Sequence, residues 1–143
     1  MSDPSLALQN AVEAALRASP VLAEAMGGRV RLYTLSADDN APFPYIVIGE
    51  DQIIGDETEC AASSEAFTTV HAWAQAGDDE VVSVARVQAK AIAALVRTTL
   101  NVALPMAGFV TTEWRFETAR HLTDPDQRTA HSVVEHRYLI DPA

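Results

Sequence analysis

The chain has 143 residues, of which 48% are hydrophobic, and a formal net charge of -10 from 20 acidic and 10 basic side chains. This length and composition predict a single domain spanning residues 1–143, with a hydrophobic core of ordinary size. The acidic balance disfavours specific binding to nucleic acid or to an anionic membrane, because both attract clustered Lys and Arg side chains. The only cysteine is Cys60, so no disulfide can form within the chain.

The first elements in chain order are helical. Leu8, Val12 and Leu16 recur at helical spacing and predict a helix over residues 4–18. A short helical turn over residues 20–28 is expected to follow, ended by its two glycines. No run in the chain approaches the roughly 20 apolar residues that span a bilayer, so a membrane partner is not expected.

The middle of the chain is expected to form strands. Residues 30–35 and 45–49 predict two strands joined by a turn-rich loop, and the second of them is a run rich in β-branched side chains. Residues 51–63 predict a loop or an extended hairpin arm. Residues 65–75 predict a third strand, whose odd-numbered side chains share one face and whose even-numbered side chains share the other.

A long helix and a final hairpin complete the prediction. The acidic cluster after Gly77 indicates a helix over residues 79–100, because carboxylates favour the positive end of a helix dipole. Its buried stripe is expected to consist of Val81, Val84, Ala85, Ile92 and Leu95. Residues 109–120 and 129–140 predict an antiparallel hairpin. One face of its first strand is expected to carry Thr111, Glu113, Arg115 and Glu117. These elements predict an α+β fold, with a mainly antiparallel sheet of about five strands and two main helices packed on one face.

No constellation of residues in the sequence indicates catalysis. The four histidines do not pair at metal-binding spacing, and two of them, His131 and His136, are expected on opposite faces of one strand. Cys60 follows three acidic residues, and nearby negative charge makes a thiol a poor nucleophile. We therefore expect no metal, no cofactor and no enzymatic activity.

Three patterns each leave two interpretations open. The loop around Asp124 and Asp126, near His121, either binds a cation or is a polar turn. Glu113 and Glu117 either form an acid–base pair or belong to a solvated charged face. A set of aromatic side chains belongs either to a binding platform or to the core: Trp73, Trp114 and Phe116.

Four stretches, in their order and spacing, resemble a known family. They are residues 41–49 (APFPYIVIG), 71–73 (HAW), 120–126 (RHLTDPD) and 131–138 (HSVVEHRY). Together they resemble the DUF3168 family, the tail completion or tail terminator proteins of long-tailed phages and phage-like gene transfer agents. The similarity extends from Leu6 to about Ile140, and this family has no catalytic residues to carry over.

The resemblance implies a structural subunit of a homohexameric ring. Such a ring caps the tail tube at its head-proximal end, ends tube polymerisation and provides the surface on which the head docks. The implied partners are further copies of the chain, the major tail tube protein and a head–tail connector or stopper protein, while DNA passes through without specific binding. Assembly is expected in the bacterial cytoplasm. Two alternatives remain open, namely another connector or tube protein of similar fold and a small ligand-binding domain or enzyme.

Two sets of residues are candidates for contacts in such a ring. In the arm over residues 51–63, Ile53 and Ile54 are expected as apolar anchors that contact the tube or the connector. The same arm carries three acidic residues: Asp56, Glu57 and Glu59. The alternative is a mobile surface hairpin. Four further acidic side chains are expected to line the channel and to keep DNA from adhering: Asp78, Asp79, Glu113 and Glu117.

Overall fold

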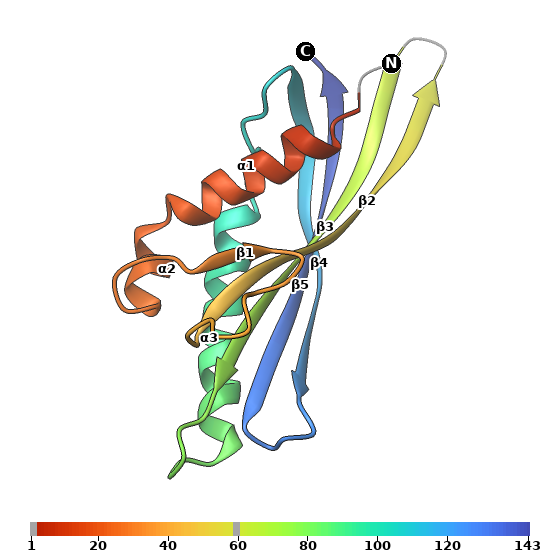
Figure 1. The fold of residues 1–143 in the computed structure, drawn as a ribbon. Coiled ribbons are helices and arrows are strands. Elements are labelled where there is room, and N and C mark those ends of the chain that lie inside the picture. The colour runs from red at the N-terminus through yellow and green to blue at the C-terminus, as the bar shows by residue number, and fades with distance from the viewer. Residues whose placement is uncertain (1–2, 59–60) are drawn as a thin grey trace.

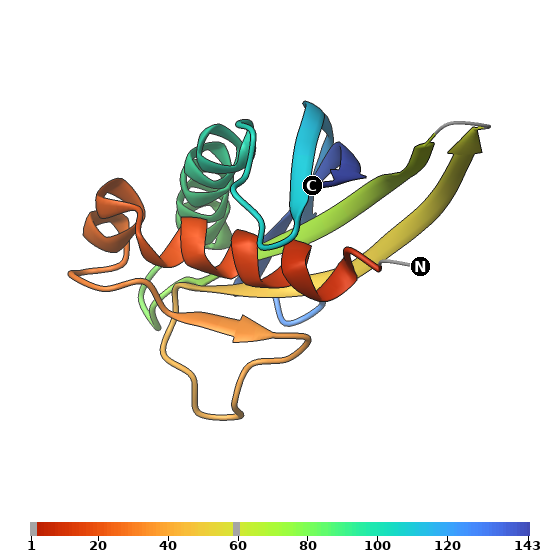
Figure 2. The same ribbon diagram turned by 90° about the horizontal axis from the view of Figure 1, so that it is seen from above.

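The computed structural model describes residues 3–58 and 61–143, which form three helices and one five-stranded sheet (Figure 1). In chain order the elements are α1 (Ser5–Arg17), α2 (Pro20–Ala25), β1 (Leu32–Thr34), β2 (Tyr45–Thr58), β3 (Ala61–Gln75), α3 (Val82–Leu100), β4 (Phe109–Thr123) and β5 (Thr129–Pro142). The strand order is β1-β2-β3-β5-β4, and every neighbouring pair is antiparallel except β1 with β2. The helices lie on one face of the sheet (Figure 2). The predicted α+β fold with a mainly antiparallel sheet is confirmed.

The core lies between the helices and the sheet. Leu8 of α1, Leu22 of α2 and Ile92 of α3 are at most 1% exposed and belong to one cluster with side chains of the strands. In β3 the even-numbered side chains from Ala66 to Ala74 are buried beneath the helices, as the alternation predicts. The odd-numbered side chains lie on the opposite surface of the sheet. We call that surface the open face, because no described helix covers it.

Helix α3 begins three residues later than predicted. The acidic residues after Gly77 form a turn, in which the Gly77 N–H donates a 2.7 Å hydrogen bond to the Glu80 carboxylate. Val81 then has an extended backbone and precedes the first helical residue, Val82. The carboxylates therefore close a turn in front of the helix and do not form its first turn.

Alanines set the rotation of α3 on the sheet. Ala85 and Ala89 pack against three alanines at the ends of β3 and β5, namely Ala74, Ala76 and Ala130. Small side chains allow this close approach, so the buried stripe consists of Ala85, Ala89, Ile92, Ala93, Val96 and Leu100. The prediction was right for Ala85 and Ile92. It was wrong for Val81 and Val84, which are 68% and 42% exposed, while Leu95 is half-buried against the core.

Two side chains of β5 bind the carboxyl end of α3. The Tyr138 hydroxyl donates a 2.6 Å hydrogen bond to the carbonyl oxygen of Leu100, and His136 Nε2 lies 3.1 Å from the carbonyl oxygen of Arg97. The last carbonyl of a helix has no partner within it, so Tyr138 satisfies an acceptor that would otherwise be unpaired. The Arg97 carbonyl also accepts from the backbone N–H of Asn101, so His136 is its second partner. His131 lies on the open face, which confirms that it and His136 leave opposite sides of the strand.

Two β-bulges change the faces of β4. The register against β5 shifts between Thr111 and Glu113 and again between Phe116 and Thr118. Each extra residue reverses the alternation. As a result Thr111 is buried and bonds to the carbonyl oxygen of Leu104, whereas Glu113 lies on the open face. The predicted continuous polar face of this strand is therefore wrong.

Candidate assembly surfaces

The first candidate surface is an arm formed by β2 and β3. β1 pairs with β2 only from Ile46 to Ile48, so beyond Ile48 no described strand lies beside the outer edge of β2. β2 and β3 continue as an antiparallel pair as far as Thr58 and Ala61. The arm reaches the end of the molecule at which β4 begins and β5 ends (Figure 1). Residues 51–58 and 61–63, the described part of this segment, confirm the hairpin arm and not the loop.

The two isoleucines of the arm leave opposite faces of β2. Ile53 lies opposite Ala66 and is partly buried against the core. Ile54 lies opposite Glu65 on the open face and is 43% exposed. Because of this alternation, Ile54 is available to a partner on the open face, whereas Ile53 packs the arm against the core. Three further candidates lie outside the part of the chain whose side chains the structure describes: Asp56, Glu57 and Glu59.

The acidic residues expected to line a channel lie in two places. Asp78 and Asp79 are exposed in the turn before α3, and an Asp78 oxygen lies 3.1 Å from the Arg128 guanidinium. Glu113 and Glu117 lie on β4, where each is beside an arginine of the sheet. The start of α3 and the start of β4 are at opposite ends of the molecule (Figure 1). The structure therefore places Asp78 and Asp79 together in one turn, apart from Glu113 and Glu117, which lie at separate positions of β4. The four residues do not form one cluster.

An aromatic cluster on the open face joins β2, β3 and β5. The rings of Trp73 and His131 stack, with centroids 4.0 Å apart and planes 14° apart. Tyr45 lies 6.4 Å from Trp73, and His71 lies 5.7 Å from His131. The shared odd-numbered face of His71 and Trp73 was a usable signal in the sequence. The contribution of Tyr45 and His131 depends on strand register, which the sequence does not specify.

The two histidines of this cluster favour their neutral forms. Burial lowers the pKa of His71, and the neighbouring His131 lowers it further. Burial also lowers the pKa of His131, against the opposing effect of Asp124, whose carboxylate lies 3.8 Å from Nδ1. Neutral imidazoles stack on aromatic rings without the cost of desolvating a charge. The cluster is therefore a flat, partly exposed platform suited to contact with another surface.

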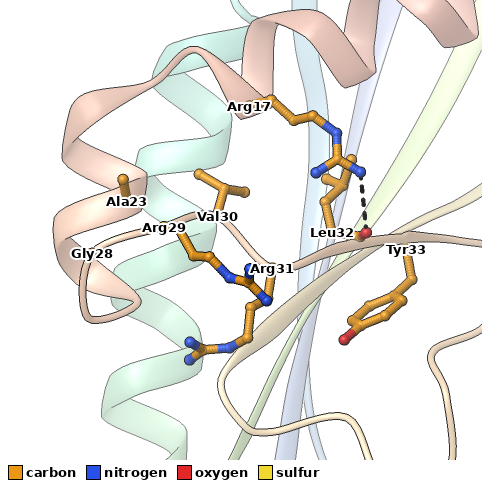
Figure 3. A pocket seen from close by; sticks show the side chains of 8 residues that line it. All are labelled: Arg17, Ala23, Gly28, Arg29, Val30, Arg31, Leu32 and Tyr33. Atoms are coloured by element: carbon orange, nitrogen blue, oxygen red, sulfur yellow. Dashed lines mark hydrogen bonds between the residues drawn. The ribbon is translucent and has the colours of Figure 1, made fainter.

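A hollow of about 540 Å³ lies between the first two helices and β1, and three arginines line it: Arg17, Arg29 and Arg31 (Figure 3). Arg31 donates to three backbone carbonyls, those of Met26, Pro42 and Pro44. Arg17 donates to the carbonyl oxygen of Leu32 and pairs with Glu13. Arg31 holds the loop before β2, because it donates to the carbonyls of Pro42 and Pro44. Two of the three guanidinium groups that line the hollow are thus already bonded within the chain.

The described residues contain no group of three or more His, Cys, Asp or Glu side chains placed to hold a metal ion. The turn between β4 and β5 contains Asp124 and Asp126, and its hydrogen bonds are those of a polar turn. Asp126 accepts hydrogen bonds from the backbone N–H groups of Arg128 and Thr129, and His121 Nδ1 lies 2.6 Å from the Ser132 hydroxyl. In the described part of the chain, no helix is long and apolar enough to cross a membrane.

Comparison with known proteins identifies relatives of this arrangement. The family model described as tail completion protein gp17 matches residues 10–141. A chain in the structure of the virion of a native gene transfer agent particle is similar in fold, with a TM-score of 0.79 and 21% sequence identity over 99% of each chain. The gp17 protein of bacteriophage SPP1 is similar with a TM-score of 0.57 and 27% identity, over 94% of this chain and 88% of that one. No curated protein matches the chain by sequence.

Proposed function

The chain belongs to the tail completion protein gp17 family, and from this premise we propose that it is the subunit of a homohexameric ring that caps a tail tube. The ring sits at the head-proximal end of the tube, ends its polymerisation and provides the surface on which the head docks. Its partners are the other copies of the chain, the major tail tube protein and a head–tail connector or stopper protein. Assembly takes place in the bacterial cytoplasm. The observation that carries this proposal is the family match, which spans nearly the whole chain.

The surfaces left uncovered by the fold support an assembly role. The outer edge of β2 beyond Ile48 and the outer edge of β4 have no described strand beside them, and the open face carries stacked aromatic side chains. Uncovered strand edges and apolar faces are the parts of a protein through which it joins other chains. A ring requires two different surfaces that fit each other, because its contacts run head to tail. The outer edges of β2 and β4 are two different surfaces of this kind.

We propose a structural role without catalysis. The aromatic platform contains no serine, cysteine or lysine side chain, and the arginines of the hollow are mostly bonded to backbone carbonyls. DNA passes through the ring without specific binding, because the net charge of -10 repels phosphate. The candidates for the channel wall are Asp78 and Asp79 at one end and Glu113 and Glu117 at the other. Lysine substitutions at Asp78 and Asp79 are expected to slow DNA release from particles, and an unchanged release rate would remove this pair from the channel wall.

The arm contacts the tube or the connector along the axis of the ring. Ile54, exposed on the open face, provides the apolar anchor, and Ile53 holds the arm against the core. The acidic side chains at Asp56, Glu57 and Glu59 accompany it along the chain. This division of roles is tested by the paired alanine substitutions described in the Discussion.

Deletion of the gene tests the proposed function. Electron microscopy of particles from deleted cells is expected to show overlong tails, or tails without heads, because nothing ends tube growth or receives the head. Supplying the unchanged gene in trans is expected to restore the tail length and the heads. A tube subunit would instead give no tails at all when deleted. Particles of normal length with heads attached would contradict the proposal.

A further inference from the structure

The two outer edges of the sheet carry opposite charge. On the β4 side, four basic side chains form no ion pair with a carboxylate of the described residues: Arg86, Lys90 and Arg97 of α3 and Arg120 of β4. On the β1–β2 side, four exposed acidic side chains likewise form none: Asp38, Asp39, Glu50 and Asp51. Six of the 10 basic side chains form no ion pair with a described carboxylate, and four of them, Arg86, Lys90, Arg97 and Arg120, border β4. The other two, Arg29 and Arg31, line the hollow beside β1, where Arg31 donates to backbone carbonyls. The β4 edge is complementary to the opposite edge of the same chain.

Two contacts and one groove place basic side chains of α3 beside β4. The Arg97 guanidinium lies 3.8 Å from the centroid of the Phe116 ring, and Arg86 donates a 2.8 Å hydrogen bond to the Thr123 hydroxyl. Lys90 lines a shallow groove between α3 and β4. These side chains therefore border the outer edge of β4 along its second half, on the helix side of the sheet. Arg120 borders the same stretch from the open face.

Each edge contains a regular stretch of strand with a free side. After its second bulge, β4 runs in unbroken register with β5 from Thr118 to Thr123, and it has no other described strand beside it. After the irregularity that follows Ile48, β2 runs in unbroken register with β3 from Asp51 onward, and its outer side is equally free. The N–H and C=O groups along such edges form hydrogen bonds with an added strand. Bulges interrupt such pairing, so these regular stretches are where it can occur.

The side chains of the two stretches match face by face. On the open face, each stretch has one exposed apolar side chain, Ile54 with 43% exposure and Leu122 with 40%. On the helix side, Asp51 lies on the β2 edge, whereas Lys90 borders the β4 edge. Placing one edge along the other therefore brings Asp51 next to Lys90 on the helix side. On the open face it places Leu122 beside Ile54 in one apolar strip, on the face by which the arm contacts the tube or the connector. Opposite charges and apolar pairs across neighbouring strands are both favourable.

We infer that the β2 edge of one copy, from Asp51 to Gly55, pairs with the β4 edge of the next copy, from Thr118 to Thr123. This contact is the lateral joint of the proposed ring and rests on that proposed function. It is heterologous, because one copy offers its β2 edge and the next its β4 edge, and such contacts close into rings when the rotation between copies allows. The sheet thereby continues from one copy to the next.

A charge exchange tests the inference. The basic-edge variant carries Lys90→Glu and Arg120→Glu, and the acidic-edge variant carries Glu50→Lys and Asp51→Lys. Each variant alone has two edges of like charge, so particles are expected to contain at least tenfold less of it than of the unchanged chain. Produced together, the two variants present opposite charges at every joint of an alternating ring. Their joint incorporation is expected to return to near the unchanged level.

Matched controls separate this effect from folding and from charge in general. Arg29→Glu and Glu24→Lys reverse exposed charges away from the β4 edge and the β2 arm, and each is expected to enter particles normally. Thermal unfolding of every purified variant establishes that it is folded. Variants that enter particles normally when produced alone overturn the inference, and so does a folded pair that stays excluded when produced together.

Chemical cross-linking gives a second, direct readout. Gln52→Cys and Arg120→Cys place thiols on the open face of the two edges, in a chain whose Cys60 is changed to serine. A short bismaleimide added to isolated particles is expected to give multiples of the chain up to the size of the ring. Either substitution alone, or Arg120→Cys combined with Glu24→Cys, is expected to give monomer. Particles that contain the doubly substituted chain as monomer after cross-linking overturn the joint and leave the proposed ring standing. Absence of the unchanged chain from particles would instead overturn the proposed function.

Discussion

Replacing Tyr138 by phenylalanine removes a single hydroxyl that holds the end of α3 to the sheet. The side chain is fully buried, and its hydroxyl donates to the carbonyl oxygen of Leu100, the last residue of the helix. That carbonyl has no partner within the helix, so the substitution leaves a buried acceptor unpaired. The free energy of unfolding is expected to fall by about 1–2 kcal/mol. For a chain of this size, the midpoint of thermal unfolding then falls by roughly 3–8 °C.

Urea unfolding followed by circular dichroism measures this loss. Tyr33→Phe is the matched control, because Tyr33 is partly exposed beside Tyr45 and its loss of a hydroxyl is expected to change little. His136→Phe removes the neighbouring contact to the carbonyl oxygen of Arg97. Since both contacts hold the same helix end, the combined loss is expected to be smaller than the sum of the two. A Tyr138→Phe chain as stable as Tyr33→Phe would refute the role given to this hydroxyl.

Three further outcomes are expected. Arg31→Ala lowers the free energy of unfolding in urea by about 2–3 kcal/mol, because three backbone carbonyls lose a charged donor, and Arg31→Lys recovers only part of it. Ile53→Ala costs about 1–2 kcal/mol in the same assay because it uncovers core, whereas Ile54→Ala leaves unfolding unchanged and lowers the fraction of tails with heads in electron micrographs. Thermal stability falls as the pH drops from about 7.5 to 5.5. Burial lowers the pKa of His136 below its ordinary value of 6.5. Below pH 6.5 the unfolded chain therefore binds a proton at this residue more readily than the folded chain, which lowers the free energy of unfolding. His136→Gln reduces this fall, and an unchanged slope would exclude His136 as its source.

The spacing of apolar residues along the chain was sufficient to predict the buried face of an element where that spacing stays regular. The alternation of β3 was predictable from Ala66 to Ala74, because a strand with one buried face has a strict period of two. The faces of β4 were not predictable, because the bulges after Thr111 and Phe116 exist only in relation to β5. The side of α3 that packs on the sheet also depended on the partner, since alanines from three segments determine it and Val84 is left outside.

The candidate surfaces also include features that the sequence predicts and features that depend on strand pairing. The arm was predictable as an extended segment, but assigning Ile53 to the core and Ile54 to the surface required the pairing of β2 with β3. The aromatic platform required two registers at once, because Tyr45 is opposite Trp73 and Trp73 is opposite His131. Composition gave the net charge of the chain. Its division between two edges is a property of the strand order, in which the first and second strands lie far from the fourth.

The division of charge also limits the symmetry of an assembly. In a two-fold dimer each edge would meet itself, which would place Lys90 and Arg120 of one copy against the same residues of the other. The acidic edge would face the same repulsion at Glu50 and Asp51. A head-to-tail arrangement is the one in which every joint brings the two unlike edges together. The right-handed twist of the sheet turns each added copy relative to the last. A constant turn at each joint closes a ring only when the copies do not advance along the axis, and it otherwise gives an open helix. The acidity of the chain thus affects assembly through where the few basic side chains lie, and the exchange of charge between the two edges tests this directly.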